Sequence, residues 1–240
     1  MIGIGTLINV GGIILGGLCG LFFGSLIKPG IQDTLMKANG LCVLFLGISG
    51  TLEQMISVSD GRLNSSGTMM MILSLSIGSL LGEWINLDQK MEEFGQWLKQ
   101  KTGNAKDRLF VDGFVTASLT VSIGAMAIVG ALQDGLTGNY STLLTKAVLD
   151  LIIICVMTAS MGKGCIFSAI PVALLQGTVT ILAKAIEPIM TQAALSNLSF
   201  VGNMLIFCVG VNLFFENTKI KVANMLPSIL IAVAWAFLPF

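Results

Sequence analysis

The sequence predicts an all-α protein, a polytopic transmembrane helix bundle of about eight spans that forms a single membrane domain over residues 1–240. Composition is the first reason: 54% of the residues are hydrophobic, only 11% are charged, and the mean hydropathy is +0.88. Soluble domains carry about 25% charged residues, so a soluble protein of this composition would precipitate. The 28 glycines are the second reason, since transmembrane helices use small residues to pack closely. The lipid bilayer is therefore the first expected partner.

Long apolar segments account for the predicted spans, because a helix needs about 20 residues to cross the hydrocarbon core. In chain order they are 3–27, 37–56, 67–87, 109–133, 142–161, 164–186, 199–216 and 222–239. The first segment has neither the basic region nor the small-residue cleavage site of a signal peptide, so we expect it to be retained as a helix.

The basic residues predict the orientation of these spans. Ten of the 13 Lys and Arg residues fall in the odd-numbered loops between the segments, and the other three fall in the even-numbered loops. Because Lys and Arg gather on the cytoplasmic side of membrane proteins, we expect the odd loops in the cytoplasm and both termini outside. The formal net charge is +0, which leaves no basic patch for nucleic acid, so we expect no nucleic-acid partner.

The third loop holds the one substantial polar stretch, residues 88–104. Met91, Phe94, Trp97 and Leu98 recur at helical spacing on one face of this stretch, with charged residues opposite. This pattern is typical of an amphipathic helix that lies in the membrane interface, here on the cytoplasmic surface. A helix that docks a regulatory partner is the alternative interpretation.

Four glycines at every fourth position line one face of the first segment: Gly12, Gly16, Gly20 and Gly24. A groove of this kind lets another helix approach backbone to backbone. The second helix belongs either to the same chain or to another copy, and a homodimer is the oligomer that we expect.

Two short stretches resemble each other and indicate an inverted repeat. Residues 44–49 read Leu-Phe-Leu-Gly-Ile-Ser in the second segment, and residues 207–212 read Phe-Cys-Val-Gly-Val-Asn in the seventh. Because the seventh segment comes five places after the second, the two copies run in opposite directions across the membrane, as the inverted repeats of many transporters do.

Asp150 is the first candidate for a binding site, because it lies eight residues into the fifth segment, or about 12 Å deep. An ionised carboxylate at the centre of a membrane helix costs about 2.5–3.5 kcal/mol on insertion scales unless it is paired or hydrated. Lys146 lies one turn earlier on the same face, so a local ion pair is the structural interpretation. A cation or proton site is the functional one.

Gln133 and Asp134 form the second candidate, at the end of the fourth segment. Asp followed by Gly is a common turn signal, so these residues indicate either a turn or a binding role. Gly124 and Gly130 precede them and make the helix easy to break. Broken helices often create the binding sites of transporters.

The sixth segment supplies the third candidate, around Pro171. A proline inside a helix cannot donate a hydrogen bond to the carbonyl four residues earlier, here that of Phe167, and that oxygen needs another partner. Gln176, followed by Gly177, brings an amide near the membrane centre, and Ser168 adds a hydroxyl. A kinked helix that forms a ligand wall and one that only packs are both consistent with this pattern.

Nothing in the sequence indicates an enzyme or a bound cofactor. The chain has no histidine, which excludes zinc and haem sites that use imidazole and also histidine proton relays. The GxSxG, HExxH, Walker A and GxGxxG motifs are also missing from the sequence. The five cysteines include no CxxC pair. The sequence leaves open whether any metal ion binds.

Several motifs together resemble a known bacterial family. They are the stretches 5–12, 124–130, 133–138, 146–150, 176–177 and 220–227. On these motifs the chain resembles the YdfK/YqgA-like family of inner-membrane proteins, a domain of unknown function (number 554), over essentially its whole length. The resemblance implies a multi-pass, transporter-like protein of the bacterial cytoplasmic membrane, and it implies no catalytic residue.

The leading hypothesis is a small secondary transporter or channel for an ion or small solute. Asp134 and Asp150 would bind a cation or proton, and Gln133, Gln176 and the carbonyl of Phe167 would supply neutral ligands. The alternative is a non-transporting membrane scaffold or sensor that signals through the cytoplasmic loop at 88–108.

Overall fold

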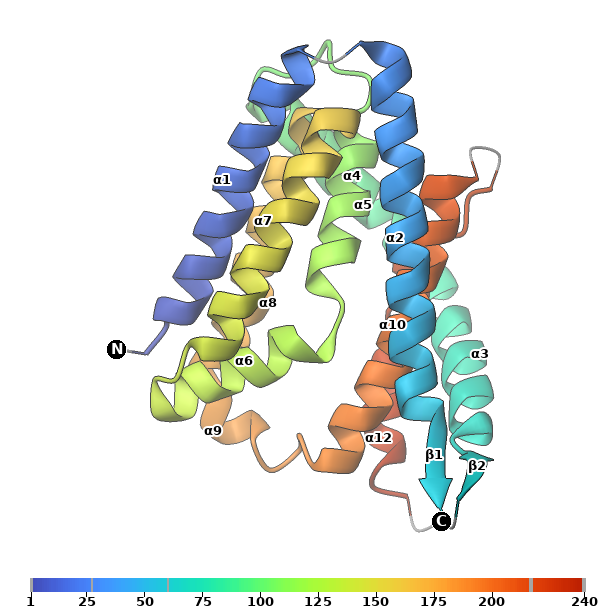
Figure 1. Cartoon of the computed structure of the whole chain (residues 1–240). Coiled ribbons are helices and arrows are strands. Elements are labelled where there is room, and N and C mark those ends of the chain that lie inside the picture. The colour runs from blue at the N-terminus through green and yellow to red at the C-terminus, as the bar shows by residue number, and fades with distance from the viewer. Residues whose placement is uncertain (1, 27, 60, 216–217, 239–240) are drawn as a thin grey trace.

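The computed structural model describes residues 2–26, 28–59, 61–215 and 218–238, which form a helix bundle with one short hairpin (Figure 1). The elements in chain order are α1 (Ile4–Leu26), α2 (Pro29–Met55), β1 (Ile56–Ser59), β2 (Arg62–Ser65), α3 (Thr68–Ile85), α4 (Leu87–Lys101), α5 (Phe110–Ser122), α6 (Ala125–Thr137), α7 (Ser141–Met161), the 3-10 helix η1 (Lys163–Ser168), α8 (Ala169–Ile181), α9 (Ala183–Ile186), α10 (Gln192–Phe214), α11 (Val222–Met225) and α12 (Pro227–Trp235).

The all-α membrane fold is confirmed, and the number of spans depends on how one bent helix is counted. Within the described residues, six helical stretches are long and apolar enough to cross a membrane, namely α1, α2, α3, α7, η1 with α8, and α10. The pair α5 and α6 makes a seventh, broken span, bent by 63°. The eighth predicted segment corresponds to the shorter apolar stretch Val222–Trp235.

Some predicted boundaries differ from the structure. The second predicted segment began at residue 37, but α2 begins at Pro29 in the first turn, where proline is favoured. The seventh began at residue 199, but α10 begins at Gln192, where the Thr191 hydroxyl accepts the N–H of Ala194 as an N-cap. Residues 27, 216 and 239, which end three predicted segments, lie outside the described residues.

The two ends of the bundle carry different connections (Figure 1). At one end, the odd-loop face, lie the turn between α1 and α2, the helix α4 and the start of η1. At the other end, the even-loop face, lie the N-terminus, the turn between α6 and α7, α9 and the hairpin of β1 and β2. The helices therefore alternate in direction as the eight predicted segments require, while the assignment of the odd-loop face to the cytoplasm stays a prediction.

The glycine groove of α1 is occupied within the chain, by the parallel helix α7. A Cβ atom added at Gly12 would lie 2.8 Å from the Ala147 carbonyl oxygen, and one added at Gly24 would lie 3.1 Å from that of Ala159. At Gly16 and Gly20 the added atom would overlap the carbonyl oxygens of the α7 residues in between. The groove therefore explains a contact inside one protomer, and the expected homodimer would need another surface.

The antiparallel helices α2 and α10 pack reciprocally through the two similar stretches. A Cβ atom at Gly47 would lie 2.5 Å from the backbone nitrogen of Phe207, and one at Gly210 would lie 2.6 Å from that of Leu44. The first residue of each stretch thus contacts the glycine of the other, as a two-fold relation between inverted repeats requires. The neighbouring pairs α1 with α8 and α3 with α12 are also in contact. The helices of the first three and the last three predicted segments therefore pack in matching pairs.

Helix α5 lies at the centre of this arrangement. Most of its residues are buried, from Phe110 to Val121, and Ala117 and Val121 belong to the largest hydrophobic cluster. Outside it, α4 packs on α5 through the buried Gly95 and Leu98. This packing holds α4 against α5, while the placement of the segment 88–104 in the cytoplasmic membrane interface stays a prediction.

Candidate functional site

The backbone at Gly124 separates α5 from α6. Ile123 is extended, and Gly124 has φ 138° and ψ 150°, a conformation that side chains rarely allow. Among the described residues, no side chain caps the first turn of α6, so the N–H groups of this turn form a partly positive helix end. Gly124 thus has the predicted role in breaking the helix. Gly130 instead allows close packing, because a Cβ there would lie 2.8 Å from Leu143.

Lys146 and Asp150 form a buried ion pair on α7. The Lys146 Nζ lies 2.8 Å from both Asp150 oxygens, and the two residues are 8% and 3% exposed. The local pairing agrees with the structural interpretation of these residues. The pair nevertheless borders a cavity of about 420 Å³, which we call the ion-pair cavity.

The ion-pair cavity combines charged, polar and backbone groups. Besides the ion pair, its lining includes the first turn of α6 from Ala125 to Ala127, together with Thr120, Asn203 and Glu53. Glu53 lies in the last turn of α2, next to the hairpin at the even-loop face. The cavity therefore brings an open helix N-terminus and a buried lysine to the same space.

Two amides are completely buried. Asn9 in α1 and Gln176 in α8 are 0% exposed, and among the described residues neither the nitrogen nor the oxygen of either amide has a hydrogen-bond partner by geometry. Asn9 of α1 lies near the Asp150 carboxylate of α7. The contact of Thr6 Oγ1 with Thr180 Oγ1, at 3.3 Å, fixes the antiparallel register of the two helices and places Asn9 level with Gln176.

Sequence reasoning missed Asn9. The available signal was an amide with apolar residues on both sides, in a segment that otherwise contains small and apolar residues. A buried polar group without a partner costs about 1–3 kcal/mol. The unpartnered atoms of both amides therefore mark this level of the bundle as a place where a further polar group would be stabilising.

Asp134 is fully buried but has a different role from Asp150. Its oxygens accept the backbone N–H groups of Gly3, at 3.2 Å, and Gly5, at 2.9 Å. This carboxylate therefore caps the N-terminus of α1 from α6, where a negative charge also compensates the helix dipole. Gln133 accepts a hydrogen bond from the Thr142 hydroxyl at 2.7 Å. Neither Asp134 nor Gln133 lines the ion-pair cavity.

The residues around Pro171, which were predicted to form a ligand wall, are explained by helix geometry and packing. Pro171 lies in the first turn of α8, directly after η1, where its missing N–H costs little. The Ser168 hydroxyl donates to the carbonyl of Cys165 at 2.7 Å, and the Phe167 ring packs 5.2 Å from that of Phe110. Gly177 has open space where a side chain would be. Of these residues, Pro171 alone lines a cavity described below.

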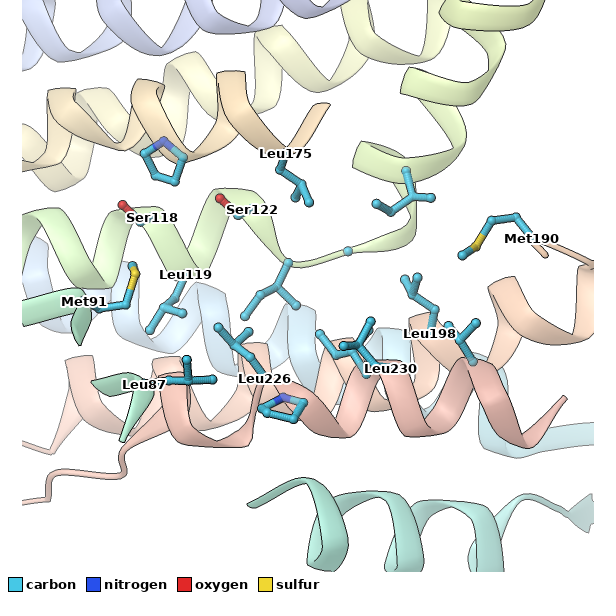
Figure 2. Close-up of a pocket in the computed structure, with 17 residues that line it drawn as sticks. Leu87, Met91, Ser118, Leu119, Ser122, Leu175, Met190, Leu198, Leu226 and Leu230 are labelled. Carbon is cyan, nitrogen blue, oxygen red and sulfur yellow. The ribbon is translucent and has the colours of Figure 1, made fainter. Parts of the chain in front are cut away.

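That cavity, of about 480 Å³, is almost entirely apolar, and we call it the apolar cavity (Figure 2). Leu175, Leu198 and Leu230 point into it from α8, α10 and α12. The two hydroxyl groups that line the apolar cavity belong to Ser118 and Ser122, which lie one turn apart on α5. Neither hydroxyl has a hydrogen-bond partner in the part of the chain that the structure describes, and Ser118 is 2% exposed.

A third cavity, of about 330 Å³, lies at the odd-loop face, and we call it the acidic cavity. Asp88, Glu92 and Asp112 line it together with Lys219, whose Nζ lies 2.7 Å from Glu92 Oε1. Burial raises the pKa of Asp88, and the nearby Glu92 carboxylate raises it further. The hydrogen bond to Glu92 raises the pKa of Lys219. Across the described ranges, no group of three or more Cys, Asp or Glu side chains is arranged to hold a metal ion.

Helix α5 and the break after it line all three cavities. Leu119 borders both the acidic and the apolar cavity, and Ile123 and Gly124 border both the apolar and the ion-pair cavity. The order of the cavities along the helix runs from the odd-loop face toward Glu53 near the even-loop face. The broken span therefore lies between spaces that approach the two ends of the bundle.

Comparisons with known proteins matched a family model and two relatives to this chain. Residues 4–237 match the model of a family described as "Protein of unknown function (DUF554)". The "Uncharacterized membrane protein YdfK" of Bacillus subtilis (strain 168) is 31% identical over 227 residues, which cover 95% of this chain and 93% of the relative. The "Uncharacterized protein YqgA" of Escherichia coli (strain K12) is 25% identical over 236 residues, which cover 95% and 94%. No solved structure matches the chain.

Proposed function

The chain belongs to the DUF554 family, and for this helical membrane protein we propose a function as a small secondary transporter or channel for an ion or small solute in the bacterial cytoplasmic membrane. The observation that carries the proposal is the broken span of α5 and α6, which borders an apolar cavity and an ion-pair cavity at Ile123 and Gly124. Discontinuous helices near the membrane centre are the usual binding elements of secondary transporters.

The buried ion pair supports the same function. Two charges held in the interior of a membrane bundle are costly to insert, and such residues usually serve transport pathways. Because the Lys146–Asp150 pair faces a cavity, a substrate or proton that enters can compete for one of its partners. A change in this pairing would distinguish two states of the bundle, as alternating access requires.

The test is flux into proteoliposomes containing the purified protein, measured as ion currents and solute uptake across a panel of ions and small solutes. Asp150→Asn is expected to reduce wild-type flux at least about tenfold, because the charge that competes for Lys146 is lost. Asp134→Asn is the matched control, since it removes an equally buried carboxylate outside the ion-pair cavity. It should lower the free energy of unfolding by about 1–2 kcal/mol through the weaker cap of α1 and leave flux largely intact.

The same measurement separates the scaffold or sensor from the transporter. The observation in favour of the scaffold is an exposed pair of stacked rings on α4, Phe94 and Trp97, with centroids 5.7 Å apart. Silence across the panel, with correctly folded and reconstituted protein, would favour a docking role for α4. Flux that survives Asp150→Asn would leave a transporter whose site lies elsewhere.

A further inference from the structure

We infer that the substrate of this transporter is a small organic acid, whose carboxylate binds beside Lys146 at the N-terminus of α6 and whose hydrocarbon part occupies the apolar cavity. The inference rests on the proposed transport function and adds the chemical class of the substrate. Three features support the inference. They are the groups that would bind the substrate carboxylate, the volume and apolar lining of the adjoining cavity, and the Asp150 carboxylate that is paired with Lys146.

The first feature is the open helix end. The N–H groups at the start of α6 have no side-chain cap, and the residues from Gly124 to Ala127 line the same cavity as Lys146. Helix N-termini bind carboxylates and phosphates through such N–H groups, and a lysine nearby adds a charge-assisted hydrogen bond. Glu53, the other acid that lines this cavity, is exposed on the last turn of α2, where water and salt screen its charge.

The second feature is the apolar cavity, which shares Ile123 and Gly124 with the ion-pair cavity. An inorganic ion in the apolar cavity would lose its hydration without gaining ligands, whereas a hydrocarbon group is stabilised there. A space of about 480 Å³ lies in the range typical of small-molecule sites, about 300–1,000 Å³. The Ser118 hydroxyl, 2% exposed and without a partner, lines the cavity and offers one polar contact. The combination fits an amphipathic molecule.

The third feature is Asp150, which behaves as an internal competitor. Both its oxygens lie 2.8 Å from Lys146 Nζ, so a substrate carboxylate must replace Asp150 to reach the lysine. The Asn9 amide lies near the Asp150 carboxylate and makes no other hydrogen bond with the described residues, so it offers an N–H donor to the displaced carboxylate. Removing the charge of Asp150 should therefore strengthen substrate binding even though it stops transport.

The test is calorimetric titration of the protein in nanodiscs with hexanoate, hexan-1-ol and hexylamine, with empty nanodiscs as the blank. We expect hexanoate to bind at least about tenfold more tightly than the other two, the difference that a charge-assisted hydrogen bond gives. Asp150→Asn should bind hexanoate about tenfold more tightly than the wild type, because Lys146 is released. The double variant Lys146→Met/Asp150→Asn, which buries no unpaired charge, should lose the preference for the acid.

A pair of tryptophan variants tests the place of the hydrocarbon part. Leu175 points into the apolar cavity, whereas its neighbour Leu174 is 64% exposed on the outside of α8. Leu175→Trp should fill the cavity and weaken hexanoate binding at least about tenfold, and Leu174→Trp should leave it unchanged.

Equal affinity for hexanoate and hexan-1-ol would overturn the inference, since the cavity would then bind any hydrocarbon chain, including that of a lipid. Weaker hexanoate binding by Asp150→Asn would overturn it as well. Binding is measured without a gradient, so its result stands apart from the flux assay. Hexanoate binding without flux would contradict the transport function alone, and ion flux without hexanoate binding would contradict the substrate class alone.

Discussion

Replacing Lys146 by methionine is expected to lower the free energy of unfolding by about 3–5 kcal/mol, because it leaves the Asp150 carboxylate buried without its partner. Asp150 is 3% exposed, and both of its oxygens depend on Lys146. Methionine nearly matches the lysine side chain in length, so the loss reports the charge rather than a cavity. The measurement is reversible unfolding in mixed micelles, followed by circular dichroism.

The double variant Lys146→Met/Asp150→Asn is the control for this prediction. With both charges removed, the buried pair becomes a neutral contact, and most of the lost stability should return. A single variant as stable as the wild type would show that water already screens Asp150. A double variant as unstable as the single one would show that methionine itself disturbs the packing.

A leucine at Gly16 is expected to destabilise the bundle by about 1–3 kcal/mol or more, because overpacking forces two backbones apart. A Cβ atom at Gly16 overlaps the Leu151 carbonyl, and the remaining side-chain atoms would separate α1 from α7. Helix α1 is capped by Asp134 of α6, and α7 carries the ion pair, so the same variant should also weaken the site. Thermal unfolding in detergent measures the effect.

Gly11→Leu is the matched control, since it makes the same substitution in the same helix, at the glycine before Gly12. A Cβ atom at Gly11 meets nothing within 4 Å, so the leucine should change the melting temperature little. Equal losses from both substitutions would attribute the effect to helix conformation and would contradict close packing of α1 on α7 as its cause.

The parts of the fold that follow from local sequence were predictable. The apolar segments predicted the helical spans because a helix in lipid must satisfy its own backbone and present apolar side chains over about 20 residues. Gly124 predicted a break, and the four-residue spacing of Lys146 and Asp150 predicted that the two could pair. Each of these inferences depends on neighbours within a few residues.

The parts that depend on distant partners were not predictable. The role of Asp134 comes from Gly3 and Gly5, about half the chain away, so the sequence indicated a turn or a binding role for Asp134 and not its capping of α1. The same holds for Asn9, which becomes notable only when α7 brings Asp150 beside it. The hairpin of β1 and β2 was also missed, although Gly61, with φ 71°, follows an aspartate in an Asp-Gly turn signal.

The central claim is that the break at Gly124 separates two routes to one buried site. It is tested most directly by labelling single cysteines with a membrane-impermeant thiol reagent from each side of the membrane, after the five native cysteines are replaced by alanine. The informative positions are Thr116→Cys in the acidic cavity, Asn203→Cys in the ion-pair cavity and Ser122→Cys between them. The account predicts that Thr116→Cys reacts from the odd-loop face, Asn203→Cys from the even-loop face and Ser122→Cys from both. Labelling of Thr116→Cys and Asn203→Cys from one and the same side, with Ser122→Cys unreactive from either, would contradict it.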